Sequence, residues 1–568
     1  MVLLLLTAAG VFAQTPTPTP LSTPPASLQD LNSIPSIAPE YKSDDRTLPD
    51  LGRVGVDMTA QRTLTLQGAI ELALENNKDI TISRQAARIA EFDLKAARGF
   101  YQPRMTGQSY YERTTIPNVS IFSDNPTTTQ SGIVANAGIQ GFVPRFGTVL
   151  TGTFNNQRVT TDNPITLLSP QLNSNLSFAV TQPLFRGRRF DQTRRTIEIA
   201  KQNIELTDIQ FRQRSIETVA SVQRAYWDLA FALRNLQVQR DSVRDANAQL
   251  EHNRRLVQEG QLAPIDIVAA ETQVANFDQA VYDALNIVNQ AENVLKNLIA
   301  PNRSDPIWSE ALTPVEPVEV DVPRLAITEA MDRAITNRPE LEINQTQKDI
   351  NAIDQRLYRD QKKPQIDLIA SYSSAGIGGS QNPNFINPFA RSVCAMPQSP
   401  ECIALLQSQQ AFLGQLGGSA TAFSDIFANK YPTLRVGVQF NIPLFGDKTA
   451  SAQLGKTLVE AERLETQREQ IEQGIQVEVR NAMQAVRTAE ARLRSAAIAR
   501  ENSAKQYESE QRKLDEGQSD IYRVLERQSA LAVARSNELR ARTELNKAIA
   551  DLDRATGNTL KANNIETK

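Results

Sequence analysis

Long stretches of this 568-residue sequence have the apolar spacing that is typical of helices. Residues 188–259 contain neither Gly nor Pro, and as one helix they would be about 108 Å long at about 1.5 Å per residue. Gly260 and Pro264 interrupt the pattern, which resumes over 265–300 and stops at Pro301. Between 216 and 236 the apolar residues cover more than one face of the helix. We therefore expect this helix to pack against neighbouring helices on two sides, as a helix in a closed wall of helices does.

Other segments alternate between apolar and polar positions, which predicts strands with one apolar and one polar face. Around 434–442, for example, Leu434, Val436 and Val438 alternate with more polar neighbours, and similar alternation occurs over 366–373 and 176–181. Such segments suit a transmembrane β-barrel, with lipid outside and water inside. The alternative is a half-buried sheet in a soluble protein.

The two halves of the chain carry similar motifs in the same order. Leu64–Asn76 resembles Leu325–Asn337, Gln182–Phe185 resembles Ile442–Phe445, and Gln258–Gln261 resembles Asp515–Gln518. The offsets drift only from 261 to 257, which predicts an internal duplication. We expect one repeat over 61–300 and a second over 324–556, each running helix, strand, strand, very long helix, tight turn, helix. A Pro-rich connector at 301–323 and a polar tail at 557–568 complete this division.

The strand count bears on assembly. Two strands per repeat give four per chain, fewer than the ~8 of the smallest bacterial barrels. An open sheet in lipid would leave backbone groups unpaired at its edges, at several kcal/mol per group. We therefore expect several copies of the chain to share one barrel.

Composition excludes several classes of function. The 61 basic and 64 acidic residues give a net charge of -3, so no basic excess indicates nucleic-acid binding. No internal apolar run approaches the ~20 residues of a membrane-spanning helix, which argues against an inner-membrane transporter. The single histidine, His252, and two cysteines argue against an enzyme, a metal site or a cofactor; His252 reads as a solvated helix residue.

The N-terminal segment has a different composition. Residues 1–13 are apolar and end in Val11-Phe12-Ala13, which predicts a secretory signal peptide; the alternative is a hydrophobic terminus without a targeting role. Residues 14–60 are rich in Pro and Thr, and we expect a disordered linker there.

Together these motifs resemble the TolC-like outer-membrane efflux protein family. The resemblance depends on the duplicated motifs above, on Ala225-Tyr-Trp-Asp-Leu229, and on the turns at Gly260 and Gly517. It implies a homotrimer in which a long α-helical barrel in the periplasm joins a transmembrane antiparallel β-barrel of twelve strands in the bacterial outer membrane. It also implies docking on a periplasmic adaptor (membrane fusion protein) and an inner-membrane pump or ABC transporter, in efflux or type I secretion.

The resemblance further implies a gate at the helical turns, at Asp266, Arg523 and Glu526. Three copies of Glu526 near a shared axis would form a negative ring that favours cations. Arg523 departs from the acidic pattern; an ion pair with Glu526 or Asp266 would latch the closed state, and a free guanidinium would weaken cation selectivity. The alternative is that all three are solvated charges at helix ends.

Further residues are candidates for contacts with the adaptor and with the membrane interfaces. The turns would contact the adaptor through six residues: Gly260, Gln261, Leu262, Gly517, Gln518 and Ser519. The two glycines would also be required simply to form tight turns with positive φ. Aromatic belts at the membrane interfaces would come from residues near strand ends, with core packing as the alternative role: Tyr111, Phe178, Phe185, Tyr372, Phe440 and Phe445.

Two insertions stand outside the minimal pattern. Residues 133–154 read as an extra hairpin that either caps the barrel or enlarges it to eighteen strands. Residues 375–430 read as a long surface loop holding Cys394 and Cys402, which we expect to form a disulfide; a buried pair of free thiols is the alternative. The rival to a channel is a secreted or periplasmic coiled-coil scaffold, which leaves the alternating strands unexplained.

Overall fold

The computed structural model describes residues 52–117, 126–316, 322–387, 390–394, 399–444 and 446–565. The chain divides into two units, Met1–Gly52 and Arg53–Lys568, and the elements below belong to the second. The expected signal peptide and most of the expected linker lie outside the described residues, as does Phe445.

Eight helices form the helical part of this unit, four from each half of the chain. In the first half they are α1 (Leu66–Asn76), α2 (Lys78–Gly99), α3 (Gln192–Gln258) and α4 (Ile265–Ile299), of 11, 22, 67 and 35 residues. In the second half they are α5 (Ile327–Asn337), α6 (Pro339–Gln361), α10 (Lys448–Asp515) and α11 (Ile521–Ala555), of 11, 23, 68 and 35 residues. Both long helices begin at an aspartate whose side chain accepts a hydrogen bond from the first turn: Asp191 from Arg194 N (2.8 Å) and Asp447 from Ala450 N (2.9 Å).

Helix α3 lies at the centre of this packing, since it contacts α1, α2, α4, α6 and α11. Its residues Tyr226, Trp227 and Leu229 are all buried although they point in different directions. The largest hydrophobic cluster joins them to Ile70 of α1 and Leu295 of α4. The prediction that this helix packs on two sides is therefore confirmed.

A small parallel sheet joins two segments that we expected to be linkers. Strand β1 (Asp57–Leu64) pairs with β6 (Glu310–Pro314), which follows a 3-10 helix at Pro306–Trp308. The expected linker 14–60 therefore extends too far, and the connector 301–323 is structured in part. The polar tail also packs: helix α12 (Thr559–Ala562) buries Leu560 against the core, and Asn563 accepts a hydrogen bond from Gln223 of α3 (3.1 Å).

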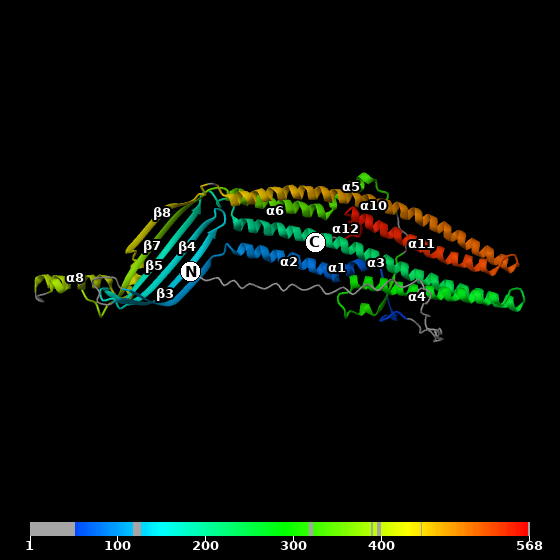
Figure 1. The fold of residues 1–568 in the computed structure, drawn as a ribbon, viewed down its shortest axis with the longest axis horizontal. Helices are drawn as coiled ribbons and strands as arrows, with labels where there is room; N and C mark the ends of the chain where they lie inside the picture. Colours follow the sequence, from blue (N-terminus) through cyan, green and yellow to red (C-terminus); the bar gives the residue numbers. More distant parts are fainter. Residues whose placement is uncertain are drawn as a thin grey trace, which may run out of the picture. The chain divides into compact units, whose positions relative to one another are not determined.

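The other six described strands form one antiparallel sheet (Figure 1). Its order is β2 (Arg104–Pro117), β3 (Thr127–Val143), β4 (Thr148–Thr161), β5 (Leu168–Pro183), β7 (Gln365–Gln381) and β8 (Tyr431–Asn441). The expected count of four strands per chain is wrong, because the hairpin β3–β4 is paired along most of its length with β2 and β5. Among the described residues, β2 and β8 each pair along one edge only.

The segment between β7 and β8 is not the long loop that we expected. It contains α7 (Ala390–Val393), α8 (Pro400–Leu416) and α9 (Ser419–Phe427), and a disulfide joins Cys394 to Cys402. Its Gly, Pro and Ser residues suggested a loop, but Ser399 and Pro400 begin α8, with Ser399 accepting from Cys402 N (3.1 Å). Among the described helices, none is long and apolar enough to cross a membrane.

Candidate functional site

The two faces of the six-stranded sheet differ in polarity. Residues paired across an antiparallel sheet point to the same side. Tyr372 is paired with Phe178 and Leu434, and the same face carries Leu150, Ile139, Leu368, Val436, Val438 and Phe440. Large apolar side chains on this face are exposed, among them Met105 at 82%, Leu434 at 72% and Phe440 at 71%. The opposite face carries mainly polar residues, including Gln108, Asn136, Thr153, Ser177, Ser373 and Gln439.

The aromatic residues proposed for an interfacial belt occupy varied places. Tyr111, Phe178, Tyr372 and Phe440 all lie on the apolar face and are exposed. Phe440 lies near the end of β8, whereas Phe178 and Tyr372 lie within their strands. Phe185 is exposed just beyond β5. These residues share a face, and their arrangement in a belt stays a prediction.

The two helical tips have closely similar backbones. Gly260 has φ +78° and Gly517 has φ +69°, which side-chain-bearing residues rarely adopt. Gln261 N donates to Leu256 O and Gln518 N donates to Lys513 O, both at 2.8 Å, so each glycine ends its long helix with the same hydrogen-bonded turn.

The tips pack against each other within one chain. Leu514, Ile521, Val524 and Leu525 form a small buried cluster at the second tip, and Leu262 from the first tip packs against it. Leu262 is therefore half-buried in an intramolecular contact, whereas Gly260, Gln261, Gly517 and Gln518 are exposed. Of the residues proposed for adaptor binding, Ser519 also has an internal partner, because its hydroxyl donates to Glu510.

The charged residues proposed for the gate lie just after these turns. Arg523 pairs with Asp520, the N-cap residue of its own helix, at 3.2 Å, rather than with Glu526 or Asp266. Asp266 accepts a hydrogen bond from Ala263 N (3.1 Å), which holds the start of α4. Glu526 is exposed on α11. Within one chain, the structure does not bring these three side chains together.

A ladder of polar contacts connects α3 to the second helical hairpin. Its six contacts are Arg224–Asp551 (3.0 Å), Asp228–Lys547 (2.9 Å), Asn235–Ser536 (2.6 Å), Asp245–Arg535 (3.4 Å), Gln249–Gln511 (3.4 Å) and His252–Asp515 (2.9 Å). His252 therefore belongs to an inter-helix contact. The ladder fixes the two hairpins against each other from the middle of α3 to the tips.

The sequence matches the family described as "Outer membrane efflux protein" over residues 134–300 and 330–558. The chain belongs to this family. The resemblance inferred from the sequence is thus confirmed, and membership implies a channel protein of the outer membrane rather than an enzyme. A comparison with curated protein sequences found no match.

Solved structures of outer-membrane channels share the fold. The outer-membrane channel OprN has a TM-score of 0.60 at 15% identity, with 92% of this chain and 98% of that chain covered. CusC has a TM-score of 0.61 at 14% identity, with 90% and 99% covered. The Campylobacter jejuni CmeC channel has a TM-score of 0.57 at 14% identity, with 91% and 94% covered. At these identities the likeness concerns the fold alone.

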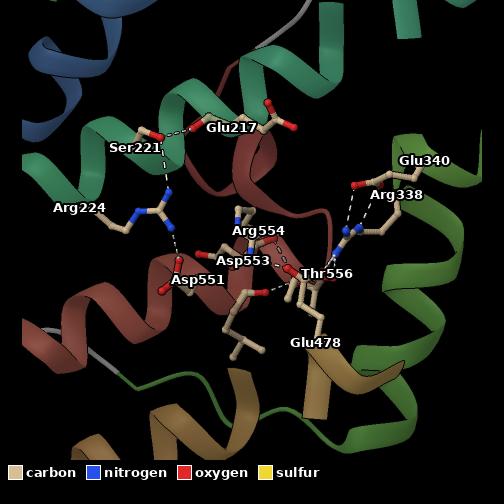
Figure 2. Close-up of polar contacts among 12 residues, drawn as sticks. Glu217, Ser221, Arg224, Arg338, Glu340, Glu478, Asp551, Asp553, Arg554 and Thr556 are labelled. Atoms are coloured by element: carbon tan, nitrogen blue, oxygen red, sulfur yellow. Dashed lines mark hydrogen bonds and ion pairs between the residues drawn. The ribbon is translucent and has the colours of Figure 1, made fainter. Parts of the chain in front are cut away.

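This efflux protein also contains a partly buried charge network where α6, α10 and α11 meet (Figure 2). We call it the Arg338 network, and it consists of Arg338, Glu340, Glu478 and Arg554. Arg338 donates to Glu340 at 2.8 and 3.0 Å, to Glu478, and to Ala555 O at 3.3 Å. Glu478 also binds Arg554. Figure 2 shows Arg224 of α3 reaching the same region through Asp551.

Proton affinities in the network follow from burial and pairing. Burial alone would raise the pKa of Glu478, but hydrogen bonds and charge from Arg338 and Arg554 outweigh it and lower that pKa. Burial lowers the pKa of Arg338, but its contacts with Glu340 and Glu478 outweigh this and raise it. The pair Arg338–Glu478 is therefore charged in the folded chain.

The Arg338 network was not predicted from the sequence. Its members are up to 216 residues apart, and each is an ordinary charged residue in a helical pattern. One feature of the sequence indicated this network: Arg338 directly follows the duplicated motif that ends at Asn337. Among the described residues, no group of His, Cys, Asp and Glu side chains is arranged to hold a metal ion.

Proposed function

We propose that three copies of this chain form a passive exit duct through the outer membrane. The observation that supports this best is the sheet, which exposes an apolar face and leaves β2 and β8 unpaired on one edge each within the described residues. Lipid tolerates exposed apolar side chains but not unpaired strand edges. Pairing β8 of one copy with β2 of the next would satisfy both edges and close a ring.

Closure by three copies gives an eighteen-stranded barrel, because each copy supplies six strands. Barrels of 16–18 strands leave an aqueous channel, whereas ~8 strands leave an interior filled by side chains. The polar face of the sheet would line this channel, and the apolar face with its exposed aromatic residues would meet lipid.

The helices would continue the duct into the periplasm as an α-helical barrel. The corresponding helices of the two halves differ by at most one residue in length, which supports an internal duplication and a pseudo-symmetric wall. Each copy would contribute two long hairpins, and their tips would close the periplasmic end.

The gate would lie at those tips, at Asp266, Arg523 and Glu526. Glu526 is exposed and free to face a shared axis, while Arg523 is held by Asp520 in each copy. The exposed turn residues around Gly260 and Gly517 would meet a periplasmic adaptor, which would connect the duct to an inner-membrane pump or ABC transporter. Efflux and type I secretion both fit such a duct.

The alternative is a secreted or periplasmic coiled-coil scaffold without a channel. It accounts for the long helices and the polar ladder, but a water-soluble scaffold would have to leave the apolar sheet face in contact with solvent. Large exposed apolar patches are rare in soluble proteins and disfavour this alternative.

Detergent extraction followed by light scattering tests the duct. We expect a particle with about three times the 62.9 kDa chain mass, and steady ion conductance when it is added to a planar lipid bilayer. A stable single-copy particle in buffer without detergent, and without conductance, would refute the proposal and favour the scaffold.

A further inference from the structure

Helix α9 is built into the apolar face of the sheet. Gly376 and Gly378 of β7 provide the space, because a Cβ on either would collide with the backbone carbonyl of Ala422 or Gly418. Ser374 Oγ donates to Ile426 O (2.9 Å), and the Phe423 ring stacks on Phe154 of β4, with centroids 6.2 Å apart. Helix α9 therefore has a fixed seat on this face.

The contact between α9 and β7 lies near the end of the sheet that is remote from the long helices. Strand β7 begins four residues after α6 ends, so Gly376 and Gly378 are toward the end remote from the helices. They lie on the same face of β7 as Leu368 and Tyr372, which are exposed at positions nearer the helices. Helix α9 therefore adjoins the exposed apolar face, in strand rows that also carry Asn156, Ser174 and the exposed Arg158.

The outward side of α9 is mainly apolar, although Ser419 and Ser424 are also exposed and the Ser424 hydroxyl donates to Thr421 O (3.1 Å). Ala422, Asp425 and Ile426 are buried against the sheet, while Ala420, Phe423 and Phe427 form an exposed stripe in which Phe427 is 84% exposed. The helix has one charged residue, Asp425, and its carboxylate pairs with Lys430 at 3.4 Å. The exposed stripe therefore carries no charge.

We propose that α9 lies in the outer leaflet of the membrane as a lipid-contacting collar on the barrel, with Ala420, Phe423 and Phe427 in contact with acyl chains. This inference rests on the proposed function, since it requires the apolar sheet face to be in lipid. Continuity with that face and the neutralised Asp425 favour lipid over water or an acidic or basic partner.

Tryptophan fluorescence tests this directly, because the chain has two tryptophans and both lie in the helical part, Trp227 in α3 and Trp308 beside β6. The full-length protein carrying Phe427→Trp is reconstituted into dioleoylphosphatidylcholine vesicles and, in parallel, into dibromostearoylphosphatidylcholine vesicles. The wild-type signal is subtracted. We expect the bromolipid to quench most of the difference fluorescence, and Ala420→Trp to behave alike.

Two matched variants separate the possible failures. Phe178→Trp, on the uncovered apolar face, reports whether the sheet is in lipid at all. Tyr110→Trp, on the polar face and in the same row as Ile377 of β7, should escape quenching. Quenching at position 178 but at neither 427 nor 420 would overturn the collar and leave the duct intact, with a protein partner or water as the neighbour of α9. Absence of quenching at all three positions would overturn the duct itself, and equal quenching at position 110 would overturn the assignment of faces.

Discussion

Glu526 is an exposed carboxylate one to two turns into α11, beyond the Asp520–Arg523 pair at the tip. If three copies face a shared axis, Glu526→Gln removes three charges from the entrance of the duct. We expect the cation-to-anion permeability ratio to fall by about two- to fivefold, because the attraction between a carboxylate and a passing cation is weak in an aqueous pore of high dielectric constant. Reversal potentials across a salt gradient in planar bilayers measure this ratio.

Glu544→Gln, further along the same helix, is the matched control and should leave the ratio unchanged. If Glu526→Gln also leaves it unchanged, Glu526 does not line the path of the ions. The pairing of Arg523 with Asp520 was not foreseen, although the three-residue spacing at a helix start is a local signal that the sequence contains.

Glu478 links α10 to both Arg338 and Arg554, and its pKa is lowered in the folded chain. A group with a lowered pKa stabilises the fold at pH values above its unfolded pKa, and that stabilisation is lost as the pH falls through the folded value. We therefore expect Glu478→Gln to destabilise the protein by about 1–3 kcal/mol at pH 7 and by less below the ordinary glutamate pKa of 4.5.

Thermal unfolding in detergent at pH 7 and at pH 3.5 measures this difference. Glu501→Gln is the control, because Glu501 forms an exposed pair with Lys505 on the same helix. Equal losses of stability by Glu478→Gln at the two pH values would contradict the charge-based account.

At the scale of elements, the helices were predictable and several strands were not. Runs free of Gly and Pro predicted 188–259 and 265–300, and α3 and α4 end within a few residues of those bounds. Strands β1 and β6 were missed because β6 has only five residues and each strand pairs with a partner about 250 residues away in the sequence. Helices α8 and α9 were missed because their few charges and nearby Gly and Pro residues resemble a loop.

A buried charge cluster connects the small sheet to α4. Glu292 and Lys296 are fully buried; Glu292 accepts from Leu312 N of β6 (2.8 Å) and pairs with Arg53 (3.2 Å), and Lys296 donates to Trp308 O (3.0 Å). Burial lowers the pKa of Lys296. Removal of Glu292 takes away the carboxylate that pairs with both Arg53 and Lys296.

We expect Glu292→Leu to cost about 3–5 kcal/mol of unfolding free energy, as is typical when one partner of a buried ion pair is removed. The double variant Glu292→Leu with Lys296→Leu should be less destabilised than the single variant, because it also removes a buried unpaired charge. Denaturant unfolding in detergent compares them. A double variant that is as unstable as the sum of the two single variants would show that the charges do not interact.

At the scale of the whole molecule, six strands per chain are more than the four expected from the sequence, yet six are still too few to close a barrel within one chain. Alternation alone did not distinguish a cap from an enlarged sheet at 133–154. The pairing of β3 with β2 and of β4 with β5 decides for the sheet, and it depends on contacts along whole strands rather than on any local motif.

Deletion of both β3 and β4, with a short turn from Pro117 to Leu168, tests how the barrel closes. Removal of two strands keeps β2 antiparallel to β5, so we expect a trimer that closes with twelve strands. Deletion of β3 alone reverses this direction and should abolish assembly. Light scattering in detergent measures the mass of each variant, and assembly by the single-strand deletion would contradict closure by antiparallel pairing.

The docking of α12 has a practical consequence for handling the protein. Leu560 and Ile565 pack against the core beside Tyr226, and Asn563 binds Gln223 in the middle of α3. An affinity tag or fluorescent fusion attached at the C-terminus would therefore emerge along the flank of the helices, away from the tips and from the strands. Such a label leaves both ends of the molecule unobstructed for binding and reconstitution measurements.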